Sequence, residues 1–475
     1  EGHDHREPHH VHERGYKENQ ELSHGGGLNL LEAGPLVKGL AGGPPGVRLA
    51  WGMNRALSAA FLGLVLVCGC GHAPSSGTTV VTFPGSMLGG EGLVLRQQLQ
   101  RFMQEHPDIQ VAQRDTPDAA DQRHQLYVQW LNAQASEPDI LQLDAIWTPE
   151  FAAAGWILPL DRFAPEKSAF FPVTVAANSW QGRLYALPWF VDVGMLYWRT
   201  DLMERPPSSL GELVEDAERA KARGVRYGFV WQGARYEGLV AVFLEYLGAF
   251  GGQILDGGKV VVNSPAGLQA LTAMRDAIYK FGIVPTSALT WHEEEARFAF
   301  QNGDAAFMRN WPYTYPLMSD STVSKVAGRF AVAPMPAAPS GAPTAALGGA
   351  QLAINARSEH PASAWAVIDY LTRPEQMLER ARVTGQFPTR RSLYDDPALG
   401  HSLAVPVAEA REIIEHAVPR PVTPVYTELS EILQIHLHRV LTRQDDPAPG
   451  LAAAAAQMQA LLNRVGLGER AVAQR

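Results

Sequence analysis

The sequence has little cysteine and no concentrated basic charge. Only Cys68 and Cys70 are cysteines among 475 residues, and 40 Lys and Arg stand against 49 Asp and Glu, a formal net charge of −9. With so few cysteines, the hydrophobic core and not a disulfide framework must supply stability. The scattered Lys and Arg cannot neutralise a run of phosphates, so nucleic acid is excluded as a partner.

Catalytic and cofactor motifs are also missing. The chain has no HExxH zinc motif, no P-loop and no recognisable Ser/His/Asp arrangement, so we expect no cofactor and no catalytic metal. Glu91, Asp144, Asp192 and Glu237 could supply the paired carboxyl groups of a glycoside hydrolase, although none lies in a catalytic motif. A secreted hydrolase therefore stays open as an alternative.

One apolar run stands out near the start of the chain. Residues 53–69 have an Arg-containing start, a short apolar centre and a small residue before Cys70. The run is too short to span a bilayer, which is typical of a signal peptide. Residues 67–70 fit a bacterial lipobox, so we expect cleavage after Gly69, lipidation of Cys70 and a flexible tether over 70–77. The protein would then be exported and anchored by lipid to the bacterial cell membrane, facing the periplasm or the cell exterior.

Residues 1–52 differ from the rest of the sequence. They carry six of the 15 histidines and a glycine-rich run, show no periodicity, and precede a credible initiator at Met53. The histidines could hold a metal. An upstream or non-native segment, absent from the mature protein, is the favoured interpretation.

Strand-like and helix-like segments alternate from Thr78 onward. Strand patterns at 109–115 and 139–147 follow helix patterns at 93–109 and 121–137. This alternation predicts an α/β fold in which each sheet is mostly parallel and flanked by helices. Such sheets bind ligands beyond the carboxyl ends of their strands.

Aromatic residues gather at 309–317, in the sequence RNWPYTYPL. Pro312 and Pro316 disfavour a helix and most strand pairing, so we expect these rings on irregular chain. Rings held on a loop suit the C–H faces of a sugar. The Pro/Ala/Gly-rich stretch at 333–349 predicts a crossover between two lobes.

Two aspartates lie in apolar surroundings. Asp144 ends the apolar strand in LQLDAIW, and Asp192 lies between apolar runs in WFVDVGMLYW. A carboxylate in such a place is costly unless it meets hydroxyls, Arg or backbone donors. Carboxylates also suit sugar hydroxyls, which donate and accept hydrogen bonds at once. We therefore expect Asp192 to contact a ligand. Asp144 is either solvated or in contact with a ligand, and the family resemblance described next implies the ligand contact.

Seven segments, taken in order, resemble the family 1 extracellular solute-binding proteins of bacterial ABC importers, most closely the trehalose/maltose-binding branch. The resemblance implies a two-lobed periplasmic-binding-protein clamp of type II, joined by hinge crossovers, with a sugar in the cleft. The implied N-terminal lobe is 78–188 with 345–392, and the implied C-terminal lobe is 189–334 with 393–475. The segments are DAIWTPEFAAAGWILPLDRF, VDVGMLYWRTDLMER, GARYEGLVAVFLEYL, FQNGDAAFMRNWPYTYPL, GGAQLAINARSEHPASAWAVIDYLT, GQFPTRRSLYDDP and RPVTPVYTELSEILQ.

The same resemblance implies further ligand contacts. Trp311 and Tyr313 match the sugar-stacking aromatics of the family. The other implied contacts are a backbone approach at Gly348 and Gly349 and polar contacts from Glu91, Arg123 and Arg390. Trp147, Glu237 and Tyr315 are expected to be structural or rim residues, and Phe190 replaces a tyrosine common in relatives, which leaves the identity of the sugar open.

The implied function is binding without catalysis. A monomer would capture a disaccharide or short α-glucoside, or another oligosaccharide, and deliver it to the transmembrane subunits of an ABC permease. The membrane would be contacted through the lipid on Cys70. A lipid-anchored envelope protein with no small ligand is a further alternative.

Overall fold

The computed structural model describes residues 77–85, 90–117, 120–338 and 341–468, which belong to one compact unit. The predictions for residues 1–52, for the signal peptide at 53–69, for lipidation of Cys70 and for most of the tether lie outside the described residues. Within the described part, no helix is long and apolar enough to cross a membrane.

The first sheet has the strand order β14-β6-β13-β3 and is antiparallel throughout. Beside it, β1 pairs with β2 in parallel. Side chains alternate between the two faces of the first sheet. Ile140 and Leu352 therefore face the core that includes α1 and α10, whereas Leu141 and Ala353 face the core that includes α2 and α3. The strands are β1 (Thr79–Gly85), β2 (Ile109–Asp115), β3 (Ile140–Asp144), β6 (Ala186–Val191), β13 (Ala350–Ile354) and β14 (Phe387–Pro388).

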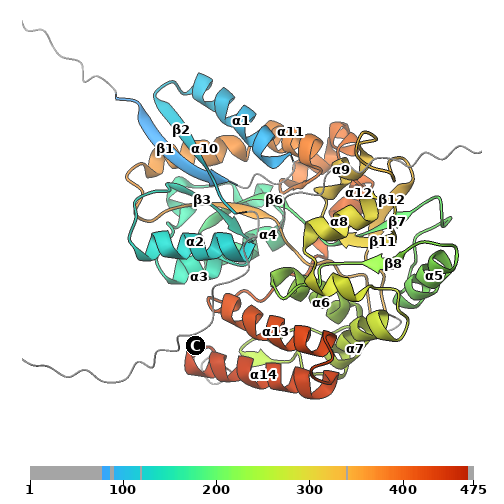
Figure 1. Cartoon of the computed structure of the whole chain (residues 1–475). Helices are drawn as coiled ribbons and strands as arrows, with labels where there is room; N and C mark the ends of the chain where they lie inside the picture. Colours follow the sequence, from blue (N-terminus) through green and yellow to red (C-terminus); the bar gives the residue numbers. More distant parts are fainter. Residues whose placement is uncertain (1–76, 86–89, 118–119, 339–340, 469–475) are drawn as a thin grey trace, which may run out of the picture. The chain divides into compact units, whose positions relative to one another are not determined.

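The second sheet has the order β12-β7-β11-β8, and within it β11 pairs in parallel with β8. Its other pairings, β11 with β7 and β12 with β7, are antiparallel. Figure 1 shows these strands beside α5, α6 and α8, away from β1 to β3. The strands are β7 (Met195–Arg199), β8 (Tyr227–Val230), β11 (Ala305–Asn310) and β12 (Phe330–Pro334); the short hairpins are β4 (Ser179–Trp180) with β5 (Arg183–Leu184) and β9 (Leu255–Asp256) with β10 (Lys259–Val260).

The α/β class agrees with the prediction, but the expectation of mostly parallel sheets is wrong. A parallel pair within one sheet needs a crossover that returns to the same sheet. Here the chain leaves the first sheet after β6, builds the second sheet, and returns only at β13. The chain re-enters the sheet at β13 in the direction opposite to β6, so these neighbours are antiparallel although strands and helices alternate along the sequence.

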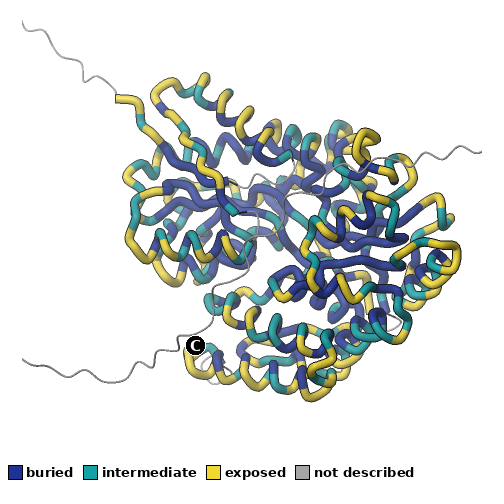
Figure 2. Tube along the Cα trace, in the orientation of Figure 1, coloured by how far each residue is buried: buried dark blue, intermediate teal, exposed yellow. Residues whose placement is uncertain are grey.

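Helices cover both faces of each sheet, and Figure 2 shows the strands buried beneath their exposed outer turns. The helices around the first sheet are α1 (Glu91–Glu105), α2 (Ala120–Asn132), α3 (Thr148–Ala153), α4 (Pro172–Ala177), α10 (Pro361–Leu371) and α11 (Pro374–Thr384). Those packed mainly around the second are α5 (Leu210–Ala222), α6 (Glu237–Ala249), α7 (Pro265–Tyr279), α8 (Glu293–Gln301), α9 (Thr314–Ser319), α13 (Tyr426–Leu441) and α14 (Pro447–Arg464). Helix α12 (Val407–Glu415), which the predicted boundaries assign to the C-terminal lobe, contacts α4.

Local sequence sets several of these helix ends. The side chains of Ser209 and Ser264 accept hydrogen bonds from the backbone N–H groups of Glu212 and Gly267, so they cap the starts of α5 and α7. Helix α11 ends at Gly385, whose φ of 72° lies in the left-handed region that glycine adopts without strain.

Two chain crossings bring the sheets together. After β6 the chain passes through Asp192 into β7, and after β12 it returns through Gly348 into β13. The backbone N–H of Gly348 donates to the carbonyl of Asp192 at 2.7 Å, so the crossings lie side by side. The lobe boundaries stay predictions; the one at residue 188 falls inside β6, which continues to Val191.

A buried ion pair fixes the second sheet next to these crossings. Arg309 of β11 donates through Nε to Glu245 of α6 at 2.8 Å and through Nη2 to the same carboxylate, and Nη1 reaches Gln232 at 3.2 Å. Both side chains are almost wholly buried. A Cβ at Gly194, on the first crossing, would lie 1.7 Å from the Glu245 carboxylate, so only glycine fits there.

Replacing Glu245 by alanine should destabilise the protein strongly. The change leaves the Arg309 guanidinium buried without its counter-ion, which costs about 3–5 kcal/mol. Urea unfolding of Glu245→Ala measures the loss. Glu218→Ala, at an exposed position of α5, is the matched control and should change stability by less than about 0.5 kcal/mol. Equal stabilities of the two variants would contradict a structural role for the pair.

Candidate functional site

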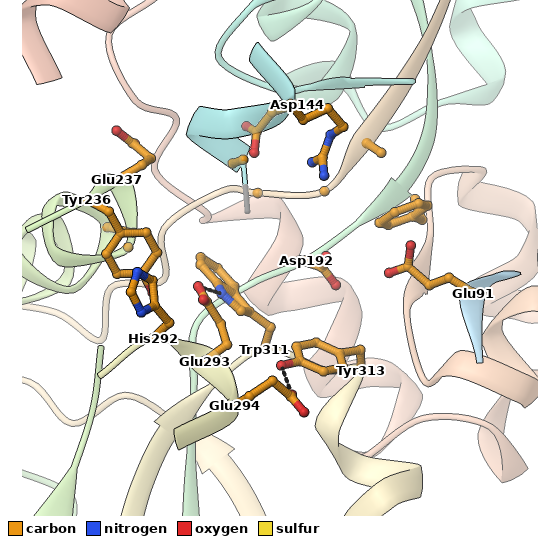
Figure 3. A pocket seen from close by; sticks show the side chains of 18 of the residues that line it. Glu91, Asp144, Asp192, Tyr236, Glu237, His292, Glu293, Glu294, Trp311 and Tyr313 are labelled. Carbon is orange, nitrogen blue, oxygen red and sulfur yellow. Dashed lines mark hydrogen bonds between the residues drawn. The ribbon is translucent and has the colours of Figure 1, made fainter. Parts of the chain in front are cut away.

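A cavity of about 350 Å³ lies where the two sheets meet. Its walls come from the end of β3, the first crossing, the starts of α1, α6 and α8, and the chain after β11 (Figure 3). The lining residues are Glu91, Ala120, Arg123, Gln142, Asp144, Phe190, Asp192, Tyr236, Glu237, Gly238, Ala241, His292, Glu293, Glu294, Glu295, Trp311, Tyr313, Gly348, Gly349, Ala350 and Arg420.

The structure brings all but one of the predicted ligand contacts to this cavity. Arg390 is the exception. Its Nε donates to the carbonyl of Thr372 at 2.6 Å, and its guanidinium lies 4.9 Å from the ring centre of Phe170. These contacts hold Arg390 on the first lobe outside the cavity lining, so a direct ligand contact from this residue is not supported.

Asp192 is the most unusual group in the cavity wall. Its Oδ1 is shielded from solvent and, among the described residues, has no hydrogen-bond partner. Burial raises the pKa of Asp192 to about 8, with repulsion from Glu91 and Asp144 adding to the shift and Arg380 opposing it. Figure 3 shows the carboxyl group directed into the cavity. A buried oxygen without a partner is costly, so this carboxyl group is poised to bind a hydroxyl or another polar group.

Asp144, in contrast, is held by an arginine that the sequence did not reveal. Arg420 donates through Nη2 to Asp144 Oδ1 at 3.0 Å and through Nη1 to Glu237 Oε1 at 2.8 Å. Glu237 also accepts from the hydroxyls of Tyr426, at 2.8 Å, and Ser430. The network joins the end of β3 to the start of α6. Glu237, expected to be structural or at the rim, thus both anchors this network and lines the cavity.

Burial and charge act in opposite directions within this network. Desolvation raises the pKa of Glu237, although Arg420 and the donor hydroxyls oppose the shift. Desolvation alone would lower the pKa of Arg420, but Asp144 and Glu237 outweigh it and raise that pKa. Arg420 therefore stays charged and keeps one oxygen of Asp144 oriented.

Trp311 and Tyr313 form an aromatic wall, with their polar atoms tied down. Trp311 Nε1 donates to Glu293 Oε1 at 3.3 Å, and the Tyr313 hydroxyl donates to Glu294 Oε1 at 2.8 Å. The Arg309 guanidinium lies 3.8 Å from the ring centre of Trp311. The wall is therefore backed by the buried ion pair.

The chain that carries these rings is less irregular than expected. Trp311 and Tyr313 precede α9, which begins at Thr314 and contains Pro316. Proline is tolerated there because the first-turn N–H groups have no acceptor within the helix. The expectation that both prolines would exclude a helix is wrong for Pro316. Tyr315 packs against Phe330 at 5.7 Å between ring centres, outside the cavity lining, in agreement with a structural role.

The two predicted glycines differ in what they require. Gly349 has φ of 104°, and a Cβ there would lie 2.2 Å from the carbonyl oxygen of Phe190. Its identity follows from the backbone alone. A Cβ at Gly348 would contact Trp311 at 3.4 Å, so this glycine keeps the floor beside the ring open.

Glu91 and Arg123 enter from the first lobe. Glu91 accepts from Gln386 Nε2 at 2.7 Å and lies 3.5 Å from Arg380 Nη2. Arg123 donates through Nη1 to the carbonyl of Pro117 at 3.0 Å and lies 5.4 Å from the ring centre of Trp147. Trp147 itself is buried in the first-lobe core and does not line the cavity.

Several lining residues were missed from the sequence. Their signal was partial: the run HEEEARF at 292–298 places three glutamates at the start of a helix, a pattern that also suits a solvated helix end. Tyr236 and His292 pack ring against ring at 4.3 Å, with no motif to mark them. In the part of the chain that the structure describes, no cluster of three or more His, Cys, Asp or Glu could hold a metal.

Comparison with known proteins identifies the family. Residues 89–378 match the family of bacterial extracellular solute-binding proteins. The chain belongs to this family. A probable ABC transporter-binding protein of Deinococcus radiodurans is 37% identical over 365 residues, which cover 73% of this chain and 86% of the relative.

Solved structures of solute-binding proteins share the two-lobed fold. Maltose-bound MalE3 of T. maritima is 42% identical with a TM-score of 0.77, over 81% of this chain and 100% of that chain. A solute-binding protein of Thermotoga lettingae, bound with α-D-tagatose, is 25% identical with a TM-score of 0.73, over 81% of this chain and 100% of that one. The chain is thus a solute-binding protein of an ABC transporter and not an enzyme.

The carboxyl group of Asp192 should impose a pH dependence on stability. Its pKa is near 3.8 when unperturbed and about 8 in the fold. The folded state therefore holds this proton more tightly, so the contribution to stability is complete below about pH 4 and is lost as the pH rises through about 8. Asp192→Asn removes this titration. Sugar-free Asp192→Asn should gain stability relative to wild type between pH 4.5 and 8.5, measured by urea unfolding.

Asp256→Asn, at an exposed position, is the control and should leave the profile unchanged. Parallel profiles of wild type and Asp192→Asn would exclude the raised pKa.

Proposed function

We propose that this protein captures a disaccharide or short α-glucoside, of the maltose or trehalose type, and delivers it to the transmembrane subunits of an ABC permease. The observation that carries the proposal is that Trp311, Tyr313 and Asp192 line one cavity, where Oδ1 of Asp192 has no hydrogen-bond partner among the residues that the structure describes. The volume of about 350 Å³ lies within the range of roughly 300–1,000 Å³ for small-molecule sites. The maltose-bound relative at 42% identity supports the sugar class.

Each part of a sugar has a matching group in this cavity. The C–H faces of a pyranose ring stack on aromatic rings, and its hydroxyls donate to carboxylates and accept from Arg. Asp192 and Asp144 offer acceptor oxygens, while Trp311 offers a ring face. Closure of the lobes 78–188 with 345–392 and 189–334 with 393–475 would exclude water and strengthen these bonds.

Sugar binding is tested by calorimetry and by thermal stabilisation with maltose and trehalose. A sugar present at 100 times its Kd should stabilise the wild type by about 2.7 kcal/mol, without any product release. Trp311→Ala removes the stacking surface and should weaken binding by about 2 kcal/mol or more, roughly 30-fold. Trp365→Ala, which removes a ring stacked on Phe163 outside the cavity lining, should leave the affinity unchanged.

Stabilisation accompanied by sugar cleavage would favour the hydrolase instead. No response to either sugar, or to longer α-glucosides, would favour an envelope protein without a small ligand.

The proposal includes export and anchoring by lipid on Cys70, as a monomer facing the periplasm or cell exterior. The support is the lipobox at 67–70 and the family, which is extracellular. In bacteria expressing the full chain, a clickable fatty acid should label the wild type, and the protein should sediment with membranes. Cys70→Ser should lose the label and become soluble, while Cys68→Ser should retain both properties. Labelling of Cys70→Ser would rule out this anchor.

A further inference from the structure

Three helices begin at the cavity, and each begins with a glutamate. Glu91 is the first residue of α1, Glu237 of α6 and Glu293 of α8, and all three line the cavity. Unpaired N–H groups and the helix dipole make a helix N-terminus attractive to anions. Here the chain supplies its own carboxylates at all three ends. A bound anion would have to compete with them.

Three arginines near the cavity already have carboxylate partners, and Arg123 donates to the carbonyl of Pro117. Arg420 bonds to Asp144 and Glu237, Arg380 lies 3.5 Å from Glu91, and Arg309 is paired with Glu245. Among the described residues, the cavity lining contains seven carboxyl groups, two arginines and no lysine. Its formal charge is −5 when histidine is neutral. A phosphate or carboxylate group would therefore enter a negative site that offers it no lysine.

Two of the carboxyl groups have no cation partner within the described residues. Neither Asp192 nor Glu293 takes part in an ion pair there, and Oδ1 of Asp192 lacks any hydrogen-bond partner. Figure 3 shows both groups around the space next to Trp311. Their charge acts on a ligand through an interior of low dielectric constant, where repulsion is stronger than in water.

We infer that the cavity selects its sugar by charge: it accepts uncharged sugars and excludes those that carry a phosphate or a carboxylate. The inference rests on the proposed function and defines its substrate class. The glutamates at the starts of α1, α6 and α8 occupy the positions that would otherwise attract an anion. Glu293 repels an anion, and Asp192 adds to the repulsion when it is ionised, above about pH 8. Sugar phosphates and uronic or aldonic acids are the excluded class.

The test compares sugars of equal size that differ in charge. Maltobionate and maltobionamide share one skeleton, and maltose is the reference. By calorimetry at pH 8.5 the amide should bind, and the acid should bind at least roughly 100-fold more weakly, since each carboxylate a few ångströms away contributes about tenfold or more. Trehalose and trehalose 6-phosphate differ by a phosphate group, and trehalose should likewise bind more tightly than its phosphate.

Glu293→Gln should reduce the ratio of the affinities for maltobionamide and maltobionate by roughly tenfold. The substitution removes one repelling charge without changing the shape of the cavity. Glu218→Gln, on the outer surface of α5, should leave this ratio unchanged. Equal binding of acid and amide would overturn the inference. Equal rejection of both, with maltose bound, would show selection by size and also overturn it. Failure of maltose and trehalose alike would instead overturn the proposed function.

Discussion

The buried pair between Arg309 and Glu245 is the interaction on which the site depends. It joins β11 to α6, lies behind the ring of Trp311, and leaves room only for glycine at position 194 on the first crossing. On the second crossing the backbone N–H of Ala346 reaches the same carboxylate at 3.4 Å. One ion pair thus fixes the aromatic wall relative to both crossings. Such a pair adds little net stability, but breaking it is costly because an uncompensated charge is left buried.

The elements of the fold were predictable because they depend on local pattern. The strand at 109–115 was placed correctly, and the buried strand predicted at 139–147 contains β3, which ends earlier, at Asp144. The direction of the strands was not predictable, because it depends on the path that the chain takes between two strands that are neighbours in a sheet. Nothing local in β6 or β13 records that a whole sheet is built between them. The helix α9 was missed for a smaller reason: Pro316 was read as a helix breaker, whereas it occupies the first turn.

The site was predictable where a residue conflicts with its surroundings. Asp144 and Asp192 are acidic within apolar runs, and both line the cavity. Arg420 gives no such signal, because its partners Asp144 and Glu237 come from sequence positions far away. Glu293 to Glu295 were hidden for the opposite reason, since acidic residues suit any helix start. The family resemblance supplied Trp311 and Tyr313, but it also suggested Arg390, whose side chain is held elsewhere.

The two aspartates contribute differently to a binding site because their environments differ. Arg420 holds one oxygen of Asp144, so that carboxylate is oriented before any ligand arrives. Within the described residues Asp192 has no such partner, and burial keeps its pKa high, so near neutral pH its carboxyl group can donate as well as accept. A sugar hydroxyl also does both, and therefore satisfies Asp192 in either protonation state. An anionic ligand group can only accept hydrogen bonds, so it would bind Asp192 only while the carboxyl group keeps its proton. An uncharged polyol therefore suits this cavity better than an acid.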